Sequence, residues 1–119
     1  MGLTRVAVKL KNFNSNDTYQ SQFLVNTGAT DSLAPGVELR KIGIKSVGKT
    51  AYELANGSIE EYEFGLAEIS FMNETTAGRV IFGPDNVEPI LGVTALESVG
   101  ITIDPTNRTL KRLPAIPLK

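Results

Sequence analysis

The stretch "FLVNTGATDSLAP", residues 23–35, decides how the rest of the chain is interpreted. Three apolar residues, 23–25, lead directly into the small polar loop Asn26-Thr27-Gly28-Ala29-Thr30. A short apolar run bounded by turn residues is typical of a buried strand. The sequence therefore predicts a strand that delivers one amide side chain, Asn26, at the start of a tight loop.

Composition excludes several classes of function. The chain has 119 residues, which favours a single domain over residues 1–119. It contains no His and no Cys, which excludes Ser-His-Asp and Cys-His catalysis and the commonest zinc ligands. We expect no cofactor and no metal, so acid–base chemistry near neutral pH would have to rest on carboxylates.

Charge and hydropathy limit the partners. The 12 Lys and Arg residues nearly balance the 13 Asp and Glu residues, so we expect no nucleic-acid partner. No apolar run approaches the length of a membrane span, and the N-terminal "MGLTRVAVKLK" lacks the apolar segment of a signal peptide. We therefore predict a cytoplasmic protein without a membrane partner.

Short extended runs surround the opening stretch. Val6, Val8 and Leu10 alternate with more polar residues, which predicts a half-buried first strand. Residues 12–18 form a polar turn cluster, and residues 19–25 form a second strand. The segment "LAPGVELRKIGIKSVGK" is broken by Pro and Gly, so we expect a winding connection with short strands.

The second half continues the pattern with one helix. Residues 51–71 are predicted to form a long hairpin, with Asn56-Gly57 as a two-residue type I′ turn. Residues 80–82 form another strand, after a turn at residues 73–75. "VTALESVG", residues 93–100, is the only convincing helix, and "ITIDP" follows as a strand. The prediction is an all-β, closed or nearly closed sheet with one short helix.

Three features occur in a recognisable order. They are Asn26-Thr27-Gly28-Ala29, the hairpin tip Ala55-Asn56-Gly57, and the segment Ile90-Leu91-Gly92 that opens into the helix. This order and spacing resembles the retropepsin-like family of aspartic peptidases, and "PILGVTALESVGITIDP" resembles its small stand-alone bacterial and archaeal members. The resemblance covers roughly residues 4–113. It implies a retropepsin-like closed barrel with one short C-terminal helix and a β-hairpin flap.

The resemblance also implies a mechanism. In the family the loop carries Asp-Thr/Ser-Gly, and two carboxylates held side by side share one proton. The ionised member activates a water, and the protonated member hydrogen-bonds the peptide carbonyl. Because one chain supplies one loop, the resemblance implies a homodimer with a two-fold interface and a peptide or protein substrate. Thr27 would then hold the loop of the opposite subunit, and Gly28 would allow a close backbone approach.

The family pattern assigns residues to two roles. Asn26, Thr27 and Gly28 take the catalytic positions. The substrate-binding positions are Ala29, Thr30 and Asp31 beside the loop, and Ala55, Asn56 and Gly57 at the flap tip. Asp31 either contacts the substrate backbone or caps the next turn, and both alternatives stay open. Apolar subsites are expected at Leu24, Leu33 and Ile90. The segments "MGLTRV" and "KRLPAIPLK" are either interface strands or disordered ends.

Asn26 stands where the family has Asp. An amide is not a useful proton acceptor and carries no charge to activate water, so the chain as written is expected to be inactive. It is either an inactivated form, with an engineered substitution, or a natural pseudo-protease that binds extended peptides. A third reading is a structural barrel in which Asn26 is an ordinary turn residue. Asp104, before Pro105, is weighed as a catalytic carboxylate, although a turn-forming role is favoured.

Overall fold

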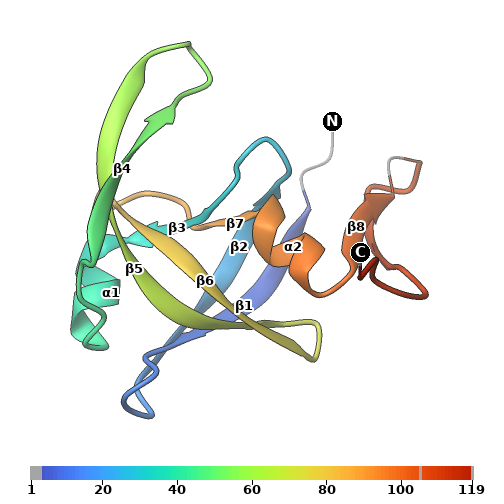
Figure 1. The fold of residues 1–119 in the computed structure, drawn as a ribbon, viewed down its shortest axis with the longest axis horizontal. Helices are drawn as coiled ribbons and strands as arrows, with labels where there is room; N and C mark the ends of the chain where they lie inside the picture. Colours follow the sequence, from blue (N-terminus) through green and yellow to red (C-terminus); the bar gives the residue numbers. More distant parts are fainter. Residues whose placement is uncertain (1–3, 105, 119) are drawn as a thin grey trace.

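The computed structural model describes residues 4–104 and 106–118. Within these residues the chain forms, in order, β1 (Arg5–Lys11), β2 (Thr18–Asn26), β3 (Ser32–Pro35), α1 (Gly36–Lys41), β4 (Gly48–Glu53), β5 (Ile59–Phe71), β6 (Glu74–Gly83), β7 (Ile90–Gly92), α2 (Val93–Ser98), β8 (Ile101–Asp104) and β9 (Thr109–Arg112). The long strands and the two short helices are all visible in Figure 1.

Strands β1 to β7 form one sheet in the order β1-β2-β7-β3-β6-β5-β4. Strand β1 also pairs with β5, where Lys9 lies opposite Ser70 and Lys11 lies opposite Glu68. This pairing closes six strands into a barrel and leaves β4 outside it, paired with β5. Strands β8 and β9 form a separate two-stranded sheet beyond α2 (Figure 1). The predicted all-β, closed-barrel fold is confirmed.

Strand alternation places the core inside this barrel. In β1, Val8 and Leu10 are buried while Ala7 and Lys9 are exposed, as the sequence pattern predicts. Phe23 from β2 is fully buried in the same cluster. Burying an apolar side chain of this size stabilises the fold by about 1.5–3 kcal/mol. The core is therefore assembled from the inward-facing positions of several strands.

The β4–β5 arm, residues 48–64, stands away from the barrel (Figure 1). Its turn differs from the prediction, because β4 ends at Glu53 and β5 begins at Ile59. The Gly57 N–H donates to the Leu54 carbonyl at 2.9 Å. Only Gly57 has a positive φ at this tip, 87°, so the predicted type I′ turn at Asn56-Gly57 is wrong.

Local hydrogen bonding explains this difference. The Asn56 Oδ1 atom accepts hydrogen bonds from the Ser58 N–H at 2.9 Å and from the Ser58 hydroxyl at 2.7 Å. This side-chain turn competes with the left-handed conformation that a type I′ turn requires of Asn56. The two successive positive φ values occur instead at Met72 and Asn73, 52° and 63°, which join β5 directly to β6.

Helix α1 was not predicted from the sequence. Pro35 and Gly36 suggested a break, but they lie at the start of the helix, where the first N–H groups have no intrahelical partner. Leu39 is fully buried, and the helix packs on β3 and β6. Gly43, with a φ of 81°, follows its end. Burial of Leu39 against the barrel thus stabilises a helix that the local sequence alone does not predict.

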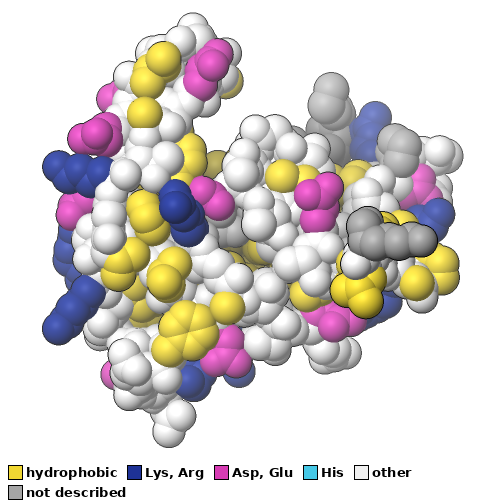
Figure 2. Space-filling model, in the orientation of Figure 1, with side chains coloured by type: hydrophobic (Ala, Val, Ile, Leu, Met, Phe, Trp, Pro, Cys, Tyr) yellow, Lys and Arg dark blue, Asp and Glu magenta, His cyan; other side chains and the backbone are white. Residues whose placement is uncertain are grey.

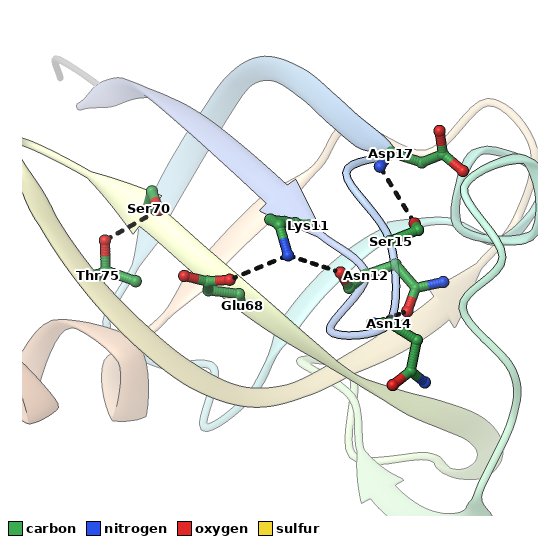
Figure 3. Close-up of polar contacts among 8 residues, drawn as sticks. All are labelled: Lys11, Asn12, Asn14, Ser15, Asp17, Glu68, Ser70 and Thr75. Atoms are coloured by element: carbon green, nitrogen blue, oxygen red, sulfur yellow. Dashed lines mark hydrogen bonds and ion pairs between the residues drawn. The ribbon is translucent and has the colours of Figure 1, made fainter.

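Asn12 fastens the β1–β2 turn to the connection that follows α1. Its Nδ2 atom donates to the Ile42 carbonyl at 2.9 Å, and its Oδ1 atom accepts from the Asn14 N–H at 2.9 Å. Figure 3 shows the turn, with Lys11 between the Asn12 carbonyl and Glu68. The barrel end opposite the β4–β5 arm is therefore tied by polar contacts as well as by its core.

The Asn12→Ala substitution is expected to lower the free energy of unfolding by about 1–2 kcal/mol, because it removes both hydrogen bonds. Urea denaturation followed by circular dichroism measures the change. Asn14→Ala is the matched control, since Asn14 takes part through its backbone N–H, and its effect should stay within about 0.5 kcal/mol. Equal losses in the two variants would contradict the assignment.

Candidate functional site

The loop after β2 borders an open groove of about 940 Å³. Figure 2 shows the hollow between the raised β4–β5 arm and the rest of the molecule. The residues that line it are Asn26, Gly28, Ala29, Thr30, Asp31, Leu33, Thr50, Ala51, Tyr52, Glu53, Leu54, Ala55, Tyr62, Ile81 and Ile90. The groove therefore has one wall from the loop and its flanking strands, and a second wall from the arm.

Asn26 is exposed at the end of β2 and organises its own loop. Its Oδ1 atom accepts a hydrogen bond from the Gly28 N–H at 2.9 Å, and its carbonyl accepts one from the Ala29 N–H at 3.1 Å. The first of these bonds requires only a side-chain oxygen, which an aspartate also provides. The loop geometry is therefore compatible with either residue at position 26.

Strand β7 holds this loop from behind. It lies between β2 and β3, with Asn26 opposite Gly92 in parallel register and Leu33 opposite Ile90. The N–H groups of Val93 and Thr94 donate to the carbonyls of residues 29 and 30, at 2.8 and 3.1 Å. Two of the free N–H groups at the start of α2 are thus satisfied by the loop, and these bonds hold the loop in place.

Gly92 is the closest point of this packing. A Cβ atom at Gly92 would lie 2.6 Å from the carbonyl carbon and oxygen of Asp31 and 2.8 Å from the Thr30 oxygen. The Gly92 N–H donates to the hydroxyl of buried Ser32 at 3.1 Å. At Gly28, by contrast, a Cβ would meet only the Asn26 Oδ1 atom, at 3.2 Å. Within one chain, the closest backbone packing around the loop is therefore at Gly92, and the close approach that the resemblance implies for Gly28 stays a prediction.

The arm contributes the edge of a strand to the groove. Residues 50–55 line the groove consecutively, so the edge of β4 and the turn that follows form this wall. Strand β4 is the last in the sheet order and pairs on one side with β5. A terminal strand presents backbone N–H and C=O groups that another extended chain can pair with.

A hydrogen bond joins the two walls. The Tyr52 hydroxyl donates to the Asp31 Oδ2 atom at 2.7 Å. Burial raises the pKa of Tyr52, and the neighbouring Asp31 carboxylate raises it further, while Arg79 acts in the opposite direction. Tyr52 therefore stays protonated and able to donate at neutral pH.

The predicted site residues fall into two groups. The structure places Asn26, Gly28, Ala29, Thr30, Asp31 and Ala55 along the groove, together with the apolar Leu33 and Ile90. Thr27, Asn56, Gly57 and Leu24 do not belong to the lining. Thr27, Asn56 and Gly57 are exposed, whereas Leu24 is half-buried opposite Ile90. The groove thus includes most of the predicted loop residues. Of the predicted flap tip it includes only Ala55.

Sequence reasoning missed the tyrosines of the arm. Tyr52 and Tyr62 line the groove, and their rings lie 6.4 Å apart between centroids. The only local signal was an aromatic residue on each strand of the predicted hairpin. Asp31 makes a contact that neither of its two sequence-based alternatives included, because its partner lies on a distant strand.

Asp104 forms a turn at the far side of α2. Its Oδ1 atom accepts a hydrogen bond from the Thr106 N–H at 2.9 Å, and its carbonyl accepts one from the Arg108 N–H at 2.7 Å. Asp104 does not line the groove. The favoured turn-forming role is what the structure shows, while the neighbouring Pro105 lies outside the described residues.

Two other features of the described chain bear on the class of site. Across residues 4–104 and 106–118, no three carboxylates are grouped in a way suited to holding a metal ion. In the same part of the chain, no helix has the length and apolar character needed to cross a membrane.

A closed barrel, a hairpin arm over a groove, and a strand packed behind the groove loop together define a retropepsin-like fold. The chain is similar to the crystal structure of the retroviral protease-like domain of Ddi1 from Leishmania major, at 15% identity and a TM-score of 0.60 over 97% of this chain and 91% of that one. It is also similar to the solution structure of simian foamy virus (mac) protease, at 11% identity and a TM-score of 0.53 over 75% of this chain and 87% of that one. No family model and no curated protein matches the sequence.

Proposed function

We propose that this chain is a single-domain aspartic endopeptidase scaffold that works as a homodimer and carries Asn26 at the catalytic position. One observation carries the proposal: Asn26 borders the groove in a loop that β7 and α2 hold in place. The aspartic protease-like fold of the solved neighbours supports it. The chain as written would bind peptides without cleaving them. A cytoplasmic location and the absence of a nucleic-acid partner, both predicted from the sequence, belong to this proposal.

The chemistry follows from an aspartate at position 26 in each of two chains. Two carboxylates brought together across a two-fold axis share one proton, because like charges at short range cannot both ionise cheaply. The ionised carboxylate takes a proton from the attacking water, and the protonated one donates to the peptide carbonyl oxygen. Thr27 and Gly28 would support the two loops where they meet. The chemical test is the return of peptide cleavage when Asn26 is replaced by Asp.

Substrate binding would use the edge of β4. An extended peptide in the groove would add to this edge as a further strand, so that backbone hydrogen bonds supply affinity and side-chain pockets supply selectivity. Leu33, Ile81 and Ile90 line the groove beside the loop, which favours apolar side chains in the peptide. Ala29, Thr30 and Asp31 face the same space.

A second candidate is a pseudo-protease that binds extended peptides in the same groove. The hydrogen bond from the Gly28 N–H to the Asn26 Oδ1 atom is consistent with this candidate, because the loop keeps its geometry without a carboxylate, although an aspartate would accept the same bond. The two candidates share the fold and the dimer and differ in origin. The codon at position 26 of the natural gene separates them: an Asp codon identifies an inactivated enzyme, and an Asn codon identifies a pseudo-protease.

Exposed apolar residues near the C-terminus support the proposed dimer. Leu113, Ile116 and Leu118 are 43, 51 and 99% exposed. They lie in the segment "KRLPAIPLK", one of the two that the sequence suggested as interface strands. Of these two segments, residues 1–3 and residue 119 lie outside the described residues. A second copy of the chain would remove these apolar side chains from water.

Cross-linking at position 28 measures whether the loops meet. The chain has no Cys, so Gly28→Cys introduces a single thiol. We expect sedimentation to give a dimer, and a short bis-maleimide to join its two chains through this thiol. Asn16→Cys, in the β1–β2 turn at the other end of the barrel, should dimerise without cross-linking. A monomeric unmodified chain, or a Gly28→Cys dimer that does not cross-link, would contradict the shared site.

A further inference from the structure

We propose that Tyr52 is a positioning residue, whose hydrogen bond to Asp31 latches the β4–β5 arm to the loop wall and sets the width of the groove. The bond crosses the groove from β4 to the loop that precedes β3, with an oxygen–oxygen distance of 2.7 Å. Both residues line the groove. The effect on peptide binding rests on the proposed function, whereas the effect on the arm does not.

The arm beyond Tyr52 has little to hold it. Residues 55–61 are all exposed, and the side-chain hydrogen bonds of Asn56 run to Ser58 within the same turn. Exposed hairpins with few buried contacts open locally at low free-energy cost. The contact at Tyr52 therefore lies where the arm changes from a supported base to a projecting tip.

The base of the arm is supported from the barrel side as well. The Arg79 Nη1 atom, from β6, donates to the Thr50 hydroxyl at 2.9 Å, and its guanidinium lies 4.0 Å from the centroid of the Phe64 ring. Arg79 and Asp31 also border the same small cavity, of about 20 Å³. Tyr52 thus sits between a cationic anchor on the barrel and an anionic acceptor on the loop.

These two supports hold the arm in different directions. Arg79 ties β4 to the strands on which the arm is built, while Tyr52 ties it to the opposite wall. Removing the Tyr52 hydroxyl leaves the hydrogen bond between Arg79 and Thr50 in place and removes the hydrogen bond to Asp31. The expected result is an arm that stays folded but opens the groove more often.

Hydrogen exchange tests the latch on the chain as it exists, with Asn26. In Tyr52→Phe, amides of residues 49–62 are expected to exchange about tenfold faster, since a hydrogen bond to a charged group is lost. Amides of β1 and the thermal midpoint should change little. Tyr62→Phe is the matched control, because Tyr62 lies on the facing strand of the arm and lines the same groove.

The outcomes separate a latch from a general structural role. Unchanged exchange in Tyr52→Phe, or equal acceleration in Tyr62→Phe, would overturn the proposal. Asp31→Ala should reproduce the acceleration, and the double variant Tyr52→Phe/Asp31→Ala should exchange no faster than either single one. Asp31→Asn, which retains an acceptor oxygen, should restore part of the protection. Additive effects in the double variant would also overturn it.

A second measurement addresses the groove. In the Asn26→Asp background, the Tyr52→Phe change is expected to speed dissociation of pepstatin, a peptide-like inhibitor, by about three- to tenfold. An unchanged dissociation rate would mean that the latch does not control the groove. If the Asn26→Asp protein binds no pepstatin, the proposed function fails, and the exchange experiment still decides whether the latch exists.

Discussion

Asn26→Asp is expected to turn the chain into a working peptidase, with cleavage of unfolded protein at least about 10²–10⁴-fold above that of the unmodified chain. The reason is that a general base and its proton-sharing partner would return together, one from each subunit of the proposed dimer. The loop itself needs no rearrangement, because the Gly28 N–H finds an oxygen acceptor in either side chain. Assays of peptide release between about pH 3 and 7, with and without pepstatin, measure the gain.

The matched control for this gain is Asn56→Asp. It makes the same chemical change at the exposed tip of the β4–β5 arm, where the side chain does not line the groove. This variant should remain inactive. A folded Asn26→Asp dimer without pepstatin-sensitive cleavage would refute the peptidase proposal and leave the peptide-binding alternative.

Gly92→Ala is expected to lower the free energy of unfolding by about 3 kcal/mol, the upper end of what overpacking costs. The added Cβ atom would lie 2.6 Å from the carbonyl carbon and oxygen of Asp31. A backbone carbonyl in the middle of a loop cannot move aside as the end of a flexible side chain can. The displacement would also disturb the loop that carries Asn26, because Gly92 lies directly opposite it. Urea denaturation gives the free energy, and pepstatin binding in the Asn26→Asp background reports on the loop.

Gly78→Ala provides the comparison for Gly92→Ala. Gly78 is also a strand glycine, but the nearest atom to its added Cβ would be the Ile69 Cδ1 atom at 3.9 Å. We expect a change within about 0.5 kcal/mol, because an ordinary contact replaces an open space. If both variants lose the same stability, strand propensity rather than the packing behind the loop explains the cost at Gly92.

The parts of the fold that depend on alternation could be predicted from the sequence. Val8 and Leu10 are buried as their pattern indicates, and the apolar run before Asn26 is a strand. The two failures had different causes: tertiary burial for helix α1, and a local side-chain hydrogen bond of Asn56 for the predicted turn. Helix α1 owes its stability to the burial of Leu39, which Pro35 and Gly36 concealed, and the type I′ turn lies at Met72-Asn73, where no glycine marks it.

Part of the candidate site could likewise be predicted from the sequence, and part could not. The loop at Asn26 has a compact local motif, so its residues could be named in advance, and all of them except Thr27 line the groove. The Tyr52–Asp31 contact has no local signal, because it joins positions on separate strands and loops that only the folded chain brings within 2.7 Å.

The position of β7 also determines when the groove loop is assembled during folding. Its partners in β2 and β3 lie more than fifty residues earlier in the chain, so the loop gains its support only after a large entropic cost of closure. Contacts between such distant segments form slowly compared with hairpins such as β5–β6. On the ribosome, the strand bearing Asn26 would emerge long before β7, which delays assembly of the loop until β7 itself has been synthesised.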